Sequence, residues 1–162
     1  VKTPALLTFG AYHDITRKWS VMAEAQKTYW SSFDNLVING HKSGVLSYTE
    51  ENWKDVWFFS LGTSYRVSED LKLRFGVAYD VTPVSDTYRT PRIPDSDRTW
   101  FTTGAEYKLT DNMTLNAGYA YIRAKKNRVN LNGTGHDQTR GPLTAQYKGN
   151  IHLFAAGINY RF

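Results

Sequence analysis

The chain has 162 residues, a net charge of +5 and no cysteine, so disulfides and thiolate metal sites are excluded. No stretch approaches the roughly 20 apolar residues of a membrane-spanning helix, which leaves strands of about 9 to 11 residues as the means of crossing a bilayer. Phe, Trp and Tyr make up 15% of the chain, a content suited to the two aromatic belts of a membrane barrel. The mean hydropathy of -0.52 agrees with such a barrel, because half of each strand faces a polar lumen.

Alternation of apolar and polar residues with a period of two predicts seven strands. In chain order they are Ala5–Asp14, Trp19–Phe33, Asn52–Val67, Leu71–Val81, Thr99–Leu109, Met113–Lys125 and a last strand from Ala145 to Phe162. The fourth has the clearest pattern, and its polar side carries Lys72 and Arg74, two cations that would not face lipid. The last strand keeps its alternation up to Phe162 and fits the closing strand of an outer-membrane barrel.

The connections between these segments alternate in length. Those near residues 17, 69 and 111 are short turns, whereas Asp34–Glu51, Thr82–Arg98 and Asn127–Thr144 are long. Short turns at one rim and long loops outside the cell are the arrangement of outer-membrane barrels. The sequence therefore predicts an all-β fold, an antiparallel transmembrane β-barrel in the bacterial outer membrane. Val45–Thr49 is too short to span and is expected to extend a hairpin above the membrane.

Seven is an odd number, and single-chain bacterial barrels have an even number of strands. We therefore expect residues 1–162 to form a single barrel segment that a second chain segment or a second copy completes. The chain has neither an initiator Met nor the apolar core of a signal peptide, which fits a mature protein or a piece of a longer one.

Several motifs resemble the C-terminal half of the FadL family, in order and over essentially the whole chain. They are Trp19 with Tyr29–Ser31 and Phe33, Trp53–Asp55 with Leu61–Tyr65, Leu73–Asp80 followed by Pro83-Val84, and Arg92–Arg98 with Trp100. The block Pro94-Asp95-Ser96-Asp97-Arg98 is the most specific of them. Alternation alone would match many barrels.

This resemblance implies passive outer-membrane uptake of long-chain fatty acids or other hydrophobic molecules through a 14-strand barrel, with no cofactor. The N-terminal hatch and the kinked strand that gate release in the family would lie upstream of Val1. The implied partners are outer-membrane lipid, the hydrophobic ligand, and the outer-membrane assembly machinery, which would contact the strand that ends at Phe162. Two alternatives stay open: a general porin or structural barrel without a specific hydrophobic ligand, and a soluble lipid-binding barrel with its apolar face inward.

A fatty acid needs an apolar slot for its tail and a cation for its carboxylate. The inward-facing candidates for the slot are Met22, Trp30, Val56, Phe58 and Ile122, and those for the head are Arg74, Lys72 or Arg66. The alternative is that Arg74 pairs with a lumen acid such as Glu24, Asp80 or Glu106, because buried charges are usually paired. Trp30 and Phe58 would then be lumen packing.

The second long connection, Thr82–Arg98, carries three charged residues close together. Asp95, Asp97 and Arg98 are expected to form a salt-bridged latch over the barrel mouth, or to hold a folded loop that has no ligand role. Pro91 and Pro94 would stiffen this loop in either case.

Catalysis, metal binding and nucleic-acid binding are not expected. His13 and Asp14 are adjacent in a strand and so point to opposite faces. His136 and Asp137 lie in a Gly-rich loop without a Gly-x-Ser-x-Gly motif, and no His-Glu-x-x-His spacing occurs. The basic residues Lys125, Lys126 and Arg128 are not interleaved with stacking aromatics, and we interpret them as a lumen or loop patch near anionic lipid headgroups.

Overall fold

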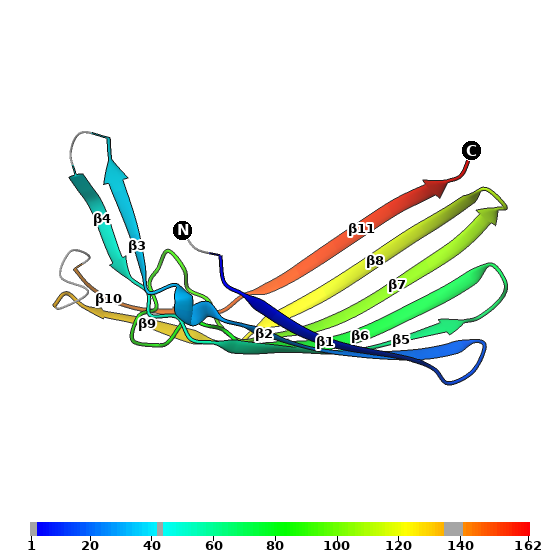
Figure 1. Ribbon diagram of the computed structural model, residues 1–162, viewed down its shortest axis with the longest axis horizontal. Coiled ribbons are helices and arrows are strands. Elements are labelled where there is room, and N and C mark those ends of the chain that lie inside the picture. The colour runs from blue at the N-terminus through cyan, green and yellow to red at the C-terminus, as the bar shows by residue number, and fades with distance from the viewer. Residues whose placement is uncertain (1–2, 42–43, 135–140) are drawn as a thin grey trace.

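Residues 3–41, 44–134 and 141–162 are described by the computed structural model. Seven antiparallel strands form one strongly curved sheet in the spatial order β1-β2-β5-β6-β7-β8-β11 (Figure 1). Their bounds are β1 Leu6–Asp14, β2 Trp19–Thr28, β5 Val56–Arg66, β6 Leu71–Asp80, β7 Arg98–Thr110, β8 Met113–Ala124 and β11 Asn150–Tyr160. The seven-strand prediction is confirmed, and every strand pairs with its neighbour in the sheet without a crossover to a distant strand.

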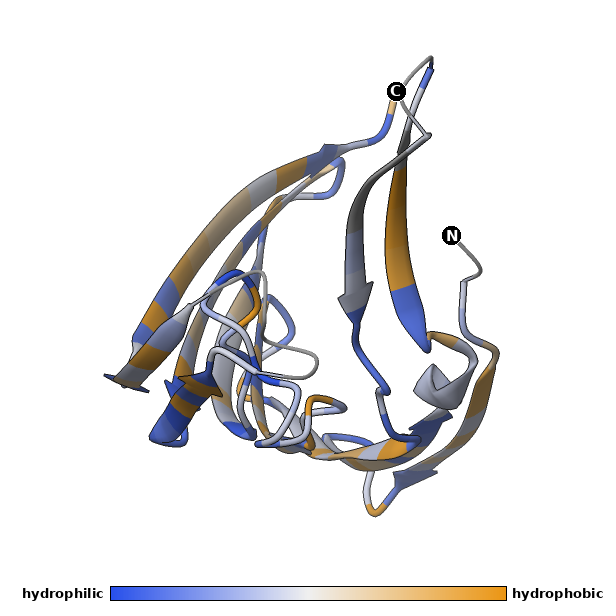
Figure 2. Ribbon diagram, turned by 90° about the vertical axis from the view of Figure 1, so that its left-hand side faces the viewer, coloured by the Kyte–Doolittle hydropathy of each residue, from blue (hydrophilic) through white to orange (hydrophobic). Residues whose placement is uncertain are grey.

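The register places polar and small residues on the concave, lumen face and apolar residues on the convex face. Arg74 lies opposite Ser64 on one side and Gly104 on the other. The next residue, Phe75, lies opposite Thr63 and Thr103 and is 51% exposed. Figure 2 shows the resulting alternation of hydrophobic and hydrophilic segments along the strands. A convex face that leaves large apolar side chains uncovered is what contact with lipid requires.

Long loops and short turns lie at opposite ends of the sheet (Figure 1). Two of the long connections fold into hairpins of their own, β3 (Asn35–Gly40) with β4 (Gly44–Glu50) and β9 (Asn127–Asn132) with β10 (Pro142–Tyr147). The predicted extension of Val45–Thr49 into a hairpin is therefore confirmed. The remaining long connection, between β6 and β7, packs over the lumen face.

Three predicted strand ends differ from the structure by four or five residues, and the others agree to within two residues. The second strand stops at Thr28 rather than Phe33, because a 3-10 helix, Trp30–Ser32, turns the chain there. The third begins at Val56 rather than Asn52, whose φ of 43° lies in the left-handed region and interrupts an extended chain. The last begins at Asn150 rather than Ala145, because the preceding residues pair with β9 across the hairpin.

The sheet has two open edges within the described residues. β1 pairs with β2 alone and β11 with β8 alone. An unpaired strand edge in hydrocarbon leaves amide and carbonyl groups without partners, each at a cost of several kcal/mol. The sheet is thus a partial barrel. Among the described residues, no helix has the length and apolar character needed to cross a membrane.

Candidate functional site

An aromatic pocket lies at the long-loop end of the lumen, where β2, β5 and β6 approach the rim. Its volume is about 340 Å³. Its apolar lining consists of Trp30, Trp53, Val56, Trp57, Phe58, Val81, Pro83, Val84 and Ile93. Val56 pairs with Thr28 of β2, and Phe58 pairs with Gln26. Both cross-strand pairs therefore line the pocket at the same height in the barrel. The lining provides an apolar slot that opens toward the lumen.

Two aromatic rings, Trp30 and Trp53, form one wall of this pocket, and Phe33 packs behind Trp53. Trp30, in the 3-10 helix after β2, packs edge-on against Trp53 with ring centroids 4.9 Å apart. Phe33 contacts the same indole at 4.8 Å. The N–H of Ser31 donates to Asp55 Oδ1 at 2.9 Å, which ties the helix to the segment that leads into β5. Edge-on aromatic pairs of this kind contribute about 0.5–1.5 kcal/mol beyond their burial, so the wall is a preformed structure.

One edge of the aromatic pocket is charged. Arg98 Nη2 lies 3.1 Å from Asp80 Oδ2 and 3.6 Å from Asp95 Oδ1. All three residues line the pocket. The Nε of Arg98 is buried and has no hydrogen-bond partner within the described part of the chain. This edge therefore combines a compensated charge with one donor that the protein itself leaves unused.

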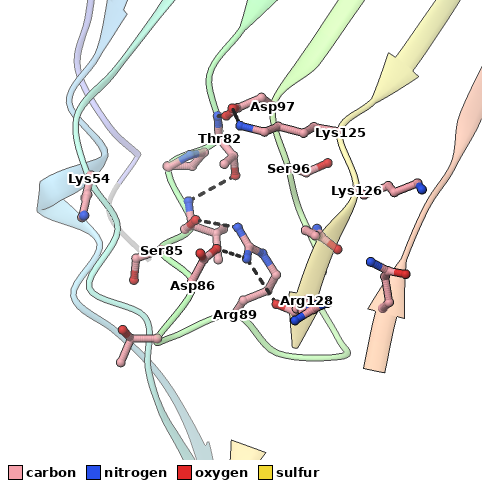
Figure 3. Close-up of a pocket in the computed structure, with 15 residues that line it drawn as sticks. Lys54, Thr82, Ser85, Asp86, Arg89, Ser96, Asp97, Lys125, Lys126 and Arg128 are labelled. Carbon is pink, nitrogen blue, oxygen red and sulfur yellow. Dashed lines mark hydrogen bonds and ion pairs between the residues drawn. The ribbon is translucent and has the colours of Figure 1, made fainter. Parts of the chain in front are cut away.

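A second and larger cavity, the basic cavity, lies beside the aromatic pocket and has a volume of about 660 Å³. Lys54 lies on one side of it, and Lys125, Lys126 and Arg128 approach from the other (Figure 3). Lys125 Nζ lies 3.4 Å from Asp97. Among the described residues, the other three cations form no ion pair. The basic cavity thus has cationic side chains available to an anionic group.

Pro83 and Val84 line both cavities. Val84 is buried, and the carbonyl of Pro83 accepts a hydrogen bond from the N–H of Lys54 at 3.0 Å. Ser85, the next residue, also lines the basic cavity and has a buried Oγ without a partner in the described structure. One short segment therefore separates an apolar slot from a basic cavity and carries an unused hydroxyl group at the boundary.

Arg89 holds the β6–β7 connection together. Its side chain is 4% exposed. Its Nε donates to the carbonyl of Asp95 at 2.8 Å, and its two terminal nitrogens donate to the carbonyls of Val84 at 3.2 Å and Arg128 at 3.3 Å. It also forms an ion pair with Asp86. One buried guanidinium thus joins both ends of the loop to β9.

Matches to known proteins identify the family. The family model described as outer membrane protein transport protein (OMPP1/FadL/TodX) matches residues 1–162. The chain belongs to this family. Its membership confirms the resemblance drawn from the sequence motifs and places the chain in the outer membrane of Gram-negative bacteria.

Individual members of the FadL family cover nearly the whole chain. The 47 kDa outer membrane protein of Pasteurella multocida is 35% identical over 98% of this chain. The long-chain fatty acid transport protein of an Escherichia coli O6:H1 strain is 28% identical over 98% of it. The crystal structure of a Pseudomonas aeruginosa FadL homologue superimposes on 97% of the chain with a TM-score of 0.88 and 28% identity. The chain spans about a third of each of these relatives, 35%, 34% and 35% in turn, so it corresponds to part of a FadL-type barrel.

Three of the five predicted slot residues meet in one place. Trp30, Val56 and Phe58 all line the aromatic pocket. Their grouping is a consequence of strand register, since Val56 and Phe58 are two residues apart on the lumen face of β5 and Trp30 follows the neighbouring strand. Their contact with ligand stays a prediction.

The other predicted residues lie outside the aromatic pocket. Met22 is opposite Gly62, nearer the short turns. Ile122 is 3% exposed and lies opposite Trp100 on the lumen face of β8. Arg74 forms an ion pair with Glu106, one of the acids expected from the sequence, and this contact favours its structural role. The pair is more than one-third exposed, so its contribution to stability is small.

Thr82 joins the residues of the predicted latch. Arg98 contacts Asp95, as expected, and the Thr82 hydroxyl donates to Asp95 Oδ2 at 2.7 Å, whereas Asp97 is bound to the Thr82 N–H and not to Arg98. Asp97 accepts hydrogen bonds from the Thr82 N–H at 3.1 Å, the Tyr79 hydroxyl at 3.1 Å and Lys125 Nζ at 3.4 Å. The loop is therefore pinned at both of its ends.

Lowering the pH is expected to loosen this loop. Burial alone would raise the pKa of Asp97, but the hydrogen bonds from Thr82, Tyr79 and Lys125 outweigh it and leave the pKa below the ordinary 3.8. A lowered pKa stabilises the folded loop fully above about pH 4, the range of an unperturbed carboxyl, and this contribution is lost as the pH falls through the folded value. Amide exchange of residues 95–98, corrected for intrinsic rates, should accelerate at pH 3 relative to pH 6. Asp97→Asn should remove most of that pH dependence, and an unchanged dependence in this variant would refute the assignment.

The sequence contains two adjacent histidine–acid pairs, His13 with Asp14 and His136 with Asp137. Asp14 accepts hydrogen bonds from the Tyr12 hydroxyl at 2.7 Å and the Ser20 hydroxyl at 2.5 Å, on the lumen face. His13 faces the convex side, so the two do not share a site, as alternation predicted. The second pair, His136 and Asp137, lies outside the described residues.

Proposed function

We propose that this chain forms part of the ligand pathway of an outer-membrane transporter for long-chain fatty acids or similar hydrophobic molecules. The observation that carries the proposal is the shared wall of Pro83 and Val84 between the aromatic pocket and the basic cavity. An amphipathic ligand could place its tail in one and its acidic head in the other. The E. coli relative named long-chain fatty acid transport protein supports this substrate class.

The two cavities match the two halves of such a ligand energetically. Each methylene that enters an apolar slot contributes about 0.8 kcal/mol. A carboxylate that meets an unpaired lysine or arginine gains a charge-assisted hydrogen bond worth about 1.5–3 kcal/mol. Lys54, Lys126 and Arg128 are such cations. Binding of this kind is specific for molecules that carry both groups.

The same geometry supports transport without chemistry. The family consists of membrane transporters, and the structure separates the one described histidine–acid neighbour pair onto two faces of β1. We infer passive movement with no enzymatic step. The open edges of β1 and β11 support a further part of the proposal, namely that strands outside this chain complete the barrel and that lipid covers its convex face.

Neutralising the basic cavity is expected to weaken fatty-acid binding selectively. In the variant Lys54→Gln/Lys126→Gln/Arg128→Gln, measured on protein extracted from outer membranes, the Kd for a long-chain fatty acid should rise roughly tenfold, or about 1.4 kcal/mol. The Kd for the uncharged alcohol of the same chain length should change less than about twofold, because its tail contacts are untouched. Lys18→Gln, which removes a cation at the short-turn rim, serves as the matched control.

Two results would contradict the proposal. Equal losses for acid and alcohol would show that the three cations maintain the fold rather than bind a head group. Steady ion conductance through the reconstituted protein, together with no saturable fatty-acid binding, would favour the general porin.

A further inference from the structure

The charged residues of the seven membrane strands are distributed unequally between the two faces. The acids of these strands, Asp14, Glu24, Asp80 and Glu106, all lie on the lumen face by register. The convex face carries basic residues instead: His13, Lys27, Arg123 and His152. Three of these four, all but His13, lie at the long-loop end. The long-loop rim of the convex face is therefore basic, and the strands themselves contribute no carboxylate to it; the nearby acids, Asp55 beside Lys27 and Asp97 beside Lys125, lie just beyond the strand ends.

Arg123 and His152 form the denser part of this rim. Arg123 is exposed and lies directly opposite Asn150. The next pair on the convex face, one step nearer the membrane centre, is Tyr121 with His152. The His152 ring packs against Tyr121 with centroids 5.0 Å apart, and its Nδ1 lies 2.8 Å from the Tyr119 hydroxyl. Because Nδ1 is engaged, Nε2 is the ring nitrogen available to a ligand. His152 is thus held against two tyrosine rings, Arg123 lies on the same face of the neighbouring strand, and neither forms an ion pair among the described residues.

An apolar groove continues from this cluster toward the membrane centre. Its volume is about 520 Å³. Its floor is a row of small residues, Ala105, Ala117 and Ala156, which are direct cross-strand neighbours on β7, β8 and β11. Tyr119 and Phe154, with ring centroids 4.9 Å apart, form the wall nearest the basic rim. Tyr119 therefore belongs to both features: its ring bounds the groove and its hydroxyl contacts His152.

The distance between the basic rim at Arg123 and the groove over Ala117 fits the distance between the headgroup and the acyl chain of a lipid. Ala117 and Arg123 are six positions apart on β8, about 20 Å along a strand. A strand tilted by about 45° turns this into a depth of about 14 Å, roughly half of a 30 Å hydrocarbon core. A headgroup at the rim would therefore place an acyl chain beside the alanines. An arginine and a histidine at one end and an apolar groove at the other match an anionic headgroup with an attached hydrocarbon chain.

We propose that the convex face of β7, β8 and β11 is a binding site for a phosphorylated lipid of the outer leaflet. Arg123 and His152 hold its phosphate, since a guanidinium can donate two parallel hydrogen bonds to phosphate oxygens. One acyl chain lies in the groove over Ala117. Charge complementarity selects this occupant, because an uncharged lipid would leave the rim without a counter-ion. This site is on the opposite side of the sheet from both lumen cavities and does not depend on the proposed transport function.

Native mass spectrometry of the detergent-extracted protein, incubated with bis-phosphorylated lipid A or with its enzymatically dephosphorylated form, tests the proposal. The wild type should retain phosphorylated lipid A, and retention should fall at least fivefold in Arg123→Gln/His152→Gln. Ala117→Leu, which fills the groove and leaves Arg123 and His152 in place, should reduce retention at least threefold. The controls are Lys27→Gln, a convex-face cation on β2, and Ala23→Leu, a convex-face alanine on the same strand. Both should retain lipid like the wild type.

Each other outcome overturns the proposal. Equal retention of the two lipid forms would show that the phosphate does not contribute to binding. Equal losses in the β2 controls would show that any change to the convex surface lowers lipid retention. A convex face occupied by a second copy would appear as a dimer without lipid. Variants are compared only where they keep the heat-modifiable mobility of a folded barrel. If Arg123→Gln/His152→Gln fails that criterion, Ala117→Leu decides the result.

Discussion

Arg89→Met is expected to release the β6–β7 connection from the barrel mouth. The substitution keeps an unbranched side chain of similar length but removes the three hydrogen bonds that Arg89 donates to the carbonyls of Val84, Asp95 and Arg128, of which the Asp95 carbonyl keeps a second donor, Asn127 Nδ2. A buried polar group that loses its partner costs about 1–3 kcal/mol, and the breaking of a buried charged network costs about 3–5 kcal/mol. We expect a loss near 3 kcal/mol in local stability, since Asp86 is 93% exposed and can be hydrated after the change.

Hydrogen exchange is the appropriate measurement, because the connection can open while the strands stay paired. A loss of about 3 kcal/mol corresponds to roughly a 100-fold fall in the protection of the amides between residues 82 and 97. Arg92→Met is the matched control: Arg92 is an exposed arginine of the same connection and forms no ion pair within the described structure. Its protection factors should change less than about threefold. Similar losses in both variants would show that net charge, rather than the buried contacts of Arg89, stabilises the loop.

The membrane strands were predictable from the sequence because lipid and lumen impose opposite chemistry on alternate residues. In β6 each apolar residue is followed by a polar or small one from Leu71 to Asp80, and this pattern alone indicates a strand and its two faces. The hairpin of β9 and β10 was harder to recognise. Val129 and Leu131 are buried, but their alternation covers six residues and lies outside the membrane, where no lipid enforces it.

The sequence predicted the part of the aromatic pocket that lies on a regular strand. Val56 and Phe58 are inward residues of a regular strand, so periodicity identifies them. Trp53 precedes the strand, and its place in the pocket depends on a turn at Asn52 and on contact with Trp30. Neither can be derived from alternation.

The role of Arg89 left no signal in the sequence. It lies among several charged residues of the same connection, and burial distinguishes it from Arg92. That burial arises when residues 84, 95 and 128 meet, and they are far apart in the chain. The basic cavity was partly visible, since Lys125, Lys126 and Arg128 are close in sequence. Lys54 joins them because the segment before β5 is hydrogen-bonded to Pro83.

Val56→Trp is expected to shorten the hydrocarbon chain that the protein can bind. Val56 lines the aromatic pocket on the lumen face of β5, and an indole at this position would occupy space in a cavity of about 340 Å³. In the wild type, each added methylene should tighten binding about fourfold, from about 0.8 kcal/mol, until the slot is full. In the variant this gain should stop about three methylenes earlier, which lowers the affinity for the longest acids by about 2.4 kcal/mol, or roughly 50-fold.

A series of fatty acids that differ only in length separates this effect from general damage. Short acids should bind the wild type and Val56→Trp with similar Kd values, because their tails do not reach the added ring. Val77→Trp introduces the same residue on the convex face of β6, where Val77 is 47% exposed, and should leave the whole series unchanged. If Val56→Trp lowered affinity equally at every chain length, the tail would not lie in this pocket. If the long acids alone are lost, the aromatic pocket sets the chain length that the transporter accepts.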